Sequence, residues 1–140
     1  MGWHRKLLRV KLGAGSSVSE PLNMAWAEAY LGQRGLATKY LTEEIDPAVD
    51  AVSPDNKLIT TTGPLTGTMA RTGGRWSAVT KGALTGTIAG SNSGRQFGGE
   101  LKSAGWDMVI LQGRAPKPVY LYIEGQPKPE TLARLGLASA

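Results

Sequence analysis

Residues 57–89 read KLITTTGPLTGTMARTGGRWSAVTKGALTGTIA, and this stretch decides how the chain is expected to fold. Residues 58–62 and 76–80 are rich in apolar and β-branched side chains, which is typical of strands. Each is followed by a glycine- and threonine-rich segment, and these two segments, 63–70 and 82–89, agree at six of eight positions. Short glycine turns between strands favour antiparallel pairing. Two interpretations of the repeat stay open: a pair of related anion pockets, or two β-turns kept by hairpin geometry alone.

The flanking sequence adds further strands and a few short helices. Leu8, Val10 and Leu12 alternate with basic residues at the strand period of two, and the turn at 13–15 predicts a hairpin. Asn23 is a suitable N-terminal cap for a helix. The other predicted elements are a return strand over 16–21, helices over 24–30, 36–44 and 97–103, and strands over 108–111 and 119–123. Together they predict an α+β fold with antiparallel sheets.

The chain of 140 residues is expected to form one domain over residues 1–126 and a divergent C-terminal tail over 127–140. The tail has weak helical character and no obvious partner strand. No run approaches the roughly 18 apolar residues of a membrane span, and the first twelve residues lack the apolar core of a secretory signal. We therefore expect a cytoplasmic protein without a membrane partner.

Composition excludes several kinds of chemistry. The chain has no Cys and a single histidine, His4, so it holds no disulfide, cysteine-ligated metal, iron–sulfur cluster or thiol nucleophile of its own. Glu43 and Glu44 are adjacent and point in different directions on a helix, which argues against a catalytic carboxylate pair. The four Trp are scattered, which argues against a base-stacking platform for nucleic acid.

The net charge of +5 is unevenly placed. Residues 1–55 carry six basic and seven acidic side chains, and residues 100–140 carry five and four. Residues 56–99 hold five basic side chains and no acid, so the excess lies in one glycine- and threonine-rich stretch. Exposed backbone N–H groups beside guanidinium groups suit phosphate, and a solvated basic face is the alternative. The threonine hydroxyls there are further candidate phosphate donors, although β-propensity alone explains most of them.

A series of motifs over residues 54–113 resembles the N-terminal domain of tungsten-containing aldehyde:ferredoxin oxidoreductases. The motifs are PDNKLI (54–59), TGPLTGT (62–68), TGGRW (72–76), VTKGALTG (79–86), SNSG (91–94) and FGGELKSAGWD (97–107). LRVKL (8–12), LGQRGLA (31–37) and KPVY (117–120) extend the resemblance to about residues 2–123. It implies the fold of a pterin base, on which the cofactor of such enzymes lies.

The resemblance also implies a cofactor and a binding site. The cofactor is tungstopterin or molybdopterin with a bridging Mg²⁺. Arg75 with Gly74, and the turn formed by Asn92, Ser93 and Gly94, are expected to contact the pterin phosphates, with Asn92 beside the Mg²⁺. Lys81 and Arg95 are weaker electrostatic candidates. No catalytic residue is expected in this chain. Arg95 stands where the family usually has a glycine, so its side chain either crowds the cofactor or adds a phosphate contact.

Enzymes of this family oxidise aldehydes to carboxylic acids and pass electrons through a [4Fe–4S] cluster to ferredoxin. The cluster cysteines and the active-site domains lie beyond this sequence, so the chain is expected to be incomplete as an enzyme. Its expected partners are the remaining oxidoreductase domains or subunit and, through them, ferredoxin, and self-association is also expected. The alternative function is a non-catalytic phosphate- or pterin-binding remnant, or an accessory protein for cofactor insertion.

Overall fold

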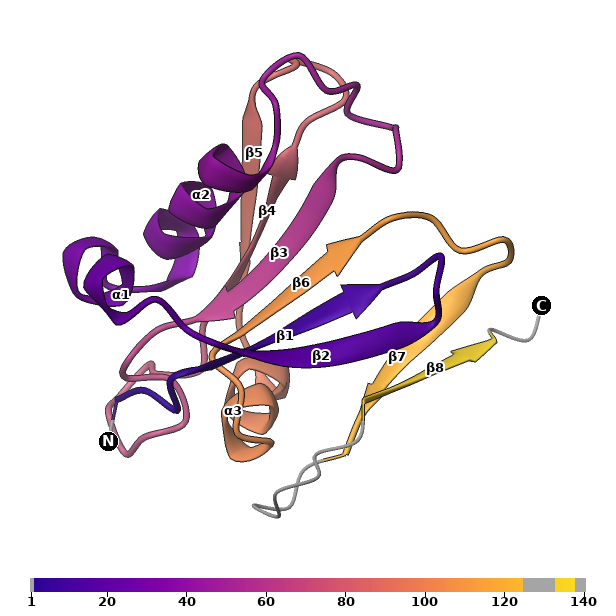
Figure 1. Ribbon diagram of the computed structural model, residues 1–140. Coiled ribbons are helices and arrows are strands. Elements are labelled where there is room, and N and C mark those ends of the chain that lie inside the picture. The colour runs from indigo at the N-terminus through magenta and orange to yellow at the C-terminus, as the bar shows by residue number, and fades with distance from the viewer. Residues whose placement is uncertain (1, 125–132, 138–140) are drawn as a thin grey trace.

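The computed structural model describes residues 2–124 and the backbone of residues 133–137, and its main element is a six-stranded sheet (Figure 1). Side by side, the sheet consists of β2 (Ser16–Pro21), β1 (Lys6–Lys11), β6 (Met108–Gln112), β3 (Lys57–Thr62), β4 (Trp76–Lys81) and β5 (Ile88–Ser93). A second sheet pairs β7 (Val119–Ile123) with β8 (Ala133–Leu137). The helices are α1 (Met24–Tyr30), α2 (Gln33–Glu44) and α3 (Gln96–Ser103).

The α+β class is confirmed, and the large sheet is mixed rather than purely antiparallel. β1 and β6 run parallel, with Leu8 opposite Val109, whereas the other four neighbouring pairs of this sheet are antiparallel. β6 inserts between β1 and β3 although it follows both of them late in the sequence. Turn chemistry specifies only the pairing of strands that follow one another, so the parallel pair could not be predicted from it.

The two faces of the large sheet are covered by different elements (Figure 1). Successive side chains of a strand point to opposite faces, and neighbouring residues such as Leu7 and Leu8 accordingly belong to different cores. One core lies under α1 and α2 and includes Leu7, Leu36, Leu41, Ile59, Val79 and Ile110. The other lies under α3 and includes Leu8, Val10, Leu101, Trp106 and Val109, with Leu121 of β7 packed against it.

The predicted helices and strands are present with small changes of boundary. Asn23 caps α1, since its side-chain oxygen accepts a hydrogen bond of 3.1 Å from the backbone N–H of Trp26. α2 begins at Gln33 rather than at residue 36, directly after Gly32, which has a φ of 88°. None of the helices in residues 2–124 is long and apolar enough to cross a lipid bilayer.

Two strands were missed in the sequence. Residues 92–94 were predicted as a turn, but Asn92 and Ser93 belong to β5, whose Gly, Ser and Asn residues give no strand signal. The prediction that residues 127–140 lack a partner strand is wrong for 133–137, because β8 pairs antiparallel with β7. The rest of that predicted tail lies outside the described residues, and the boundary at 126 stays a prediction.

An ion-pair network fastens the end of α2 to the sheet. Both terminal nitrogens of Arg9 donate to the Glu44 carboxylate at 2.8 Å, and its Nε donates to Glu20 at 2.8 Å. Lys57 Nζ donates to the same Glu44 carboxylate at 2.7 Å. Burial by itself raises the pKa of Glu44, but the hydrogen bonds from Arg9 and Lys57 outweigh it and hold that pKa below its ordinary value.

Candidate functional site

Six of the seven predicted cofactor-binding residues converge at one end of the sheet. Trp76 at the start of β4 lies opposite Ser93 at the end of β5, so the residues that flank these two strands are neighbours. Arg75 therefore lies near Gly94, and Arg95 leads directly from β5 towards α3. The guanidinium-bearing residues Arg75 and Arg95 are both exposed. The converging residues are Gly74, Arg75, Asn92, Ser93, Gly94 and Arg95.

Lys81, the seventh predicted residue, is not part of this group. It ends β4 and lies opposite Ile88, at the other end of the same two strands. Its ammonium donates to the backbone carbonyls of Pro47, at 2.6 Å, and Val49. Lys81 thus fastens the loop after α2. Its distance from Arg75 is set by the length of β4, which is about 20 Å for six residues at roughly 3.3 Å each.

The repeated segments 63–70 and 82–89 also lie at opposite ends of β4. Both contain a left-handed glycine at the matching position, Gly67 with a φ of 74° and Gly86 with a φ of 65°, so their turn geometry is shared. Their surroundings differ, because Thr66 is buried whereas its counterpart Thr85 is exposed. Within one copy of the chain the two segments therefore cannot line a common pocket, and only 63–70 lies near Arg75.

Close backbone contacts hold the segment before β4 against the start of α3. A Cβ atom on Gly74 would lie 3.2 Å from the carbonyl oxygen of Arg95. One on Gly98, in the first turn of α3, would lie 3.2 Å from both the Gly74 carbonyl oxygen and the Thr66 side chain. Trp76 packs on Phe97 with ring centroids 4.6 Å apart. These contacts show why glycine suits both positions, which the spacing of motifs alone did not reveal.

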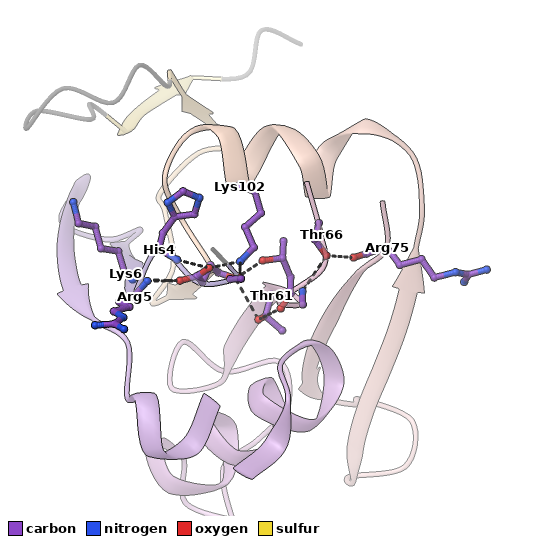
Figure 2. A network of polar contacts seen from close by, with 11 residues as sticks. His4, Arg5, Lys6, Thr61, Thr66, Arg75 and Lys102 are labelled. Atoms are coloured by element: carbon purple, nitrogen blue, oxygen red, sulfur yellow. Dashed lines mark hydrogen bonds and ion pairs between the residues drawn. The ribbon is translucent and has the colours of Figure 1, made fainter. Parts of the chain in front are cut away.

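The main chain at Arg75 is fixed by two side chains to which the sequence analysis assigned no such role. Its carbonyl accepts hydrogen bonds from the Thr66 hydroxyl, at 3.1 Å, and from Gln33 Nε2, at 3.3 Å. The same hydroxyl accepts from the N–H of Gly63 at 3.1 Å, so it is occupied in holding the loop. The side chain of Arg75 points away from this network (Figure 2). Its guanidinium is thus presented from a rigid backbone.

The polar contacts continue from this loop to the N-terminal segment (Figure 2). Thr61 and Thr62 donate their hydroxyls to the backbone carbonyl of Asp107 at 3.3 and 3.0 Å. The Asp107 carboxylate forms a buried ion pair with Lys102 of α3. It also accepts from the backbone N–H of Arg5 at 2.7 Å. This carboxylate is neutralised internally, so it does not oppose an anion at the nearby surface.

The donors at this end of the sheet suit an anion. The N-terminus of α3 has no side-chain cap, so its first N–H groups stay available beside Arg75 and Arg95. A Cβ on Gly94 would meet nothing within 4 Å, which leaves the backbone there open to a ligand. The buried indole N–H of Trp76 has no acceptor among the described residues. Arg71, also exposed, adds a third guanidinium on the adjoining loop.

Arg95 connects β5 to α3 in a conformation that side chains other than glycine rarely adopt. Its φ is 67°, within the left-handed region. The family resemblance implies a glycine at this position, and the backbone geometry gives the physical reason for that preference.

Asn92 is the residue expected beside a metal ion. Its side-chain oxygen accepts a hydrogen bond of 2.6 Å from the hydroxyl of the buried Ser77, which fixes its orientation at the edge of the sheet. No group of three or more His, Cys, Asp or Glu residues that could hold a metal occurs in the described part of the chain. A cation here would therefore depend on oxygen atoms of a bound ligand.

Comparison with known proteins identifies the family of the chain. The family model of the aldehyde ferredoxin oxidoreductase N-terminal domain matches residues 7–128. The chain belongs to this family. It is 53% identical over 125 residues to a tungsten-containing aldehyde ferredoxin oxidoreductase of Pyrococcus abyssi, and 51% identical over 124 residues to that of Pyrococcus furiosus. A more distant relative, 36% identical, is the WOR-like subunit of an aliphatic sulfonate oxidoreductase of Pyrococcus furiosus.

Among solved structures, the fold is similar to a chain of the active site complex BamBC of benzoyl coenzyme A reductase in complex with 1,5-dienoyl-CoA. The TM-score is 0.90 at 32% sequence identity over 97% of this chain. These family members are much longer. The match covers 89% of this chain but only 21% of the Pyrococcus abyssi protein, and 20% of the benzoyl coenzyme A reductase chain. The chain thus corresponds to about one fifth of its relatives.

Proposed function

We propose that this chain is the cofactor base of a tungsten- or molybdenum-pterin aldehyde oxidoreductase, completed by domains or a subunit that this sequence does not contain. One observation carries the proposal: Arg75, the segment 92–95 and the uncapped start of α3 meet at one end of the sheet. Guanidinium and backbone N–H donors arranged in this way favour phosphate groups. The names of the relatives supply tungsten, and the family resemblance implies that a pterin carries the metal.

The residues present fit the phosphate part of a pterin cofactor. Arg75 would hold a phosphate through charge-assisted hydrogen bonds, and the N–H groups after Gly94 would complete its coordination. Arg95 adds positive charge. The proposed phosphate site does not include Lys81, because Lys81 lies at the other end of β4. When bound, the metal centre supplies the two-electron oxidation of an aldehyde to a carboxylic acid. The chain itself binds and orients, and none of its residues is assigned a proton-transfer role.

Asn92 can supply only one of the ligands of the proposed Mg²⁺. Mg²⁺ prefers six oxygen ligands and keeps several waters, so one amide oxygen needs phosphate oxygens beside it. The Ser77 hydroxyl uses one lone pair of the Asn92 oxygen and leaves the second available. Mg²⁺ retention is therefore proposed to require the bound phosphates.

In this proposal, the domains or subunit that this sequence does not contain hold the [4Fe–4S] cluster and pass electrons to ferredoxin. A cysteine-free chain ligates no such cluster, and electrons would reach ferredoxin through the completed enzyme. The same proposal places the protein in the cytoplasm, the compartment in which such oxygen-sensitive chemistry is expected.

Phosphate binding by the purified chain tests the anion site. We expect a titration with inorganic phosphate to shift the backbone amide resonances of residues 94–98. Arg75→Ala should weaken this binding about tenfold or more, because a charge-assisted contact contributes roughly 1.5–3 kcal/mol. Arg114→Ala, which removes a charge after β6 at the other end of the sheet, is the matched control. Equal binding by the two variants would refute the role of Arg75.

Tungsten and molybdenum content tests the cofactor. We expect one metal per chain in material purified from the native host, together with a cysteine-containing polypeptide. A metal-free chain without such a partner favours the second candidate function, a non-catalytic remnant that keeps the fold. The left-handed φ of Arg95, at a position where glycine is expected, is the observation in favour of that candidate.

A further inference from the structure

The two repeated segments, 63–70 and 82–89, are similar in sequence but have different surroundings. The first packs on α3, since a Cβ atom on Gly67 would lie 3.0 Å from the Cβ of Lys102. A Cβ on Gly86, the matching glycine of the second, would meet nothing within 4 Å. Residues 83–89 are all exposed. The first segment is thus packed between other elements, whereas the second is a turn at the surface.

The matching threonines of the two segments also use their hydroxyls differently. Thr66 is 4% exposed, and its hydroxyl donates to the carbonyl of Arg75 at 3.1 Å while it accepts from the N–H of Gly63. The hydroxyl of Thr85 bonds only within its own turn among the described contacts, to the hydroxyl of Thr87 at 2.9 Å and to its N–H at 3.3 Å. Thr85 therefore stabilises a local turn, and Thr66 ties its segment to the residue before β4.

We propose that Thr66 is a positioning residue of the anion site: its hydroxyl fixes the carbonyl of Arg75 and thereby the direction in which the guanidinium extends. The inference rests on the proposed function, because it takes this guanidinium as the phosphate-binding group. The side chain of Arg75 points away from the Thr66 hydroxyl (Figure 2). Thr66 therefore acts through Arg75 and does not touch the anion.

A fixed main chain matters here because an arginine side chain has several rotatable bonds. Any freedom of the backbone beneath it adds to the entropy that is lost when an anion binds. The second hydrogen bond to the Arg75 carbonyl, from Gln33 Nε2 at 3.3 Å, lies at the surface, where water competes for the same oxygen. The Thr66 bond comes from a buried residue, so it is the more secure of the two.

Phosphate titration of the purified chain, carrying substitutions at Thr66, tests this role. Thr66→Val removes the hydroxyl and keeps the methyl group, which lies 3.2 Å from the place of a Cβ on Gly98. This variant should bind inorganic phosphate about three- to tenfold more weakly, the range expected for the loss of one hydrogen bond. Thr66→Ser restores the hydroxyl and should restore most of the affinity. Thr66→Val should cause no further loss in an Arg75→Ala background, since it acts through Arg75.

Two matched variants separate positioning from a general loss of stability. Thr62→Val also removes a buried hydroxyl, which donates to the carbonyl of Asp107 at 3.0 Å. It should lower the free energy of unfolding about as much as Thr66→Val but leave phosphate affinity unchanged. Thr85→Val, at the matching position of the second segment, should change neither quantity. Equal weakening of phosphate binding by Thr62→Val and Thr66→Val would overturn the proposal.

NMR relaxation in the absence of phosphate tests the hold on Arg75 by itself. The order parameter of the Arg75 backbone amide should fall in Thr66→Val from a rigid value of about 0.85 towards about 0.6, and should stay high in Thr62→Val. An Arg75 amide that stays rigid in Thr66→Val would overturn the proposal.

The two measurements distinguish this inference from the proposed function. A wild-type chain that binds no phosphate would refute the anion site, and the relaxation result would still decide whether Thr66 holds Arg75. Weaker binding by Arg75→Ala with unchanged binding by Thr66→Val would support the anion site and refute the positioning role.

Discussion

Replacing Asp107 with asparagine should be among the most destabilising changes at this end of the sheet. The Asp107 carboxylate is fully buried and forms an ion pair with Lys102, whose side chain is 5% exposed. It also accepts hydrogen bonds from the backbone N–H groups of Arg5, at 2.7 Å, and His4, at 3.2 Å. The substitution would leave the Lys102 ammonium buried without its counter-charge, and would present an amide group to N–H donors.

The magnitude follows from these contacts. Removing one partner of a buried ion pair typically costs about 3–5 kcal/mol. A domain of this size has a total stability of about 5–15 kcal/mol, so the variant should fold but unfold much more readily. Lys102→Met should cost less than Asp107→Asn, because the carboxylate left behind keeps its backbone N–H donors. In the double variant the two effects should not add, since both remove the same interaction.

Urea denaturation followed by circular dichroism measures these differences. With an m-value of about 2 kcal/mol/M, Asp107→Asn should lower the midpoint by about 2 M. Asp55→Asn, which removes a carboxylate from an exposed loop, should shift the midpoint little. A loss below about 1 kcal/mol for Asp107→Asn, or additive effects in the double variant, would contradict the reasoning that the pair is buried and coupled.

Two further predictions concern local geometry and pH. Arg95→Gly should raise the free energy of unfolding by up to about 1 kcal/mol, because glycine adopts the left-handed φ without strain. Arg95→Ala keeps the strain and should give no such gain. Thermal unfolding of both variants, compared with the wild type, measures the difference. Burial raises the pKa of Glu44, but its basic partners lower it more, so the folded pKa lies below the ordinary value of about 4.5. The stabilisation from this carboxylate is therefore fully present above pH 4.5 and is lost as the pH falls through the lower folded pKa. The difference in unfolding free energy between the wild type and Glu44→Gln should therefore be largest near neutral pH and shrink in acid; a difference independent of pH would show that the ion pairs do not link folding to this proton.

The candidate site was only partly visible in the sequence. The acid-free composition of residues 56–99 predicted an anion site in this stretch, and the family resemblance predicted Arg75, Asn92 and Gly94 as its residues. Thr66 and Gln33, which hold the carbonyl of Arg75, were not identified for this purpose. Their partner is a backbone atom, and a hydrogen bond to backbone leaves no signature in the residue types on either side.

The grouping of the basic residues was decided by the order and direction of the strands. Lys81 and Arg75 flank the same strand, and composition treats them as equivalent members of one basic stretch. Antiparallel pairing of β4 and β5 places Arg75 with the segment 92–95 and moves Lys81 to the far end. A strand of six residues separates its ends by about 20 Å, which is more than a single phosphate contact can span.

By itself the sequence determined the class of fold, the strand–turn–strand character of residues 57–89, the capped start of α1 and the basic, cysteine-free character of the chain. These features depend on local propensity, periodicity and composition, which are written in neighbouring residues. Only the tertiary structure decided that β6 lies parallel to β1, that β8 pairs with β7 and that β5 is an open edge. Those features depend on contacts between distant segments, because register and strand order are set by which apolar faces can be buried together.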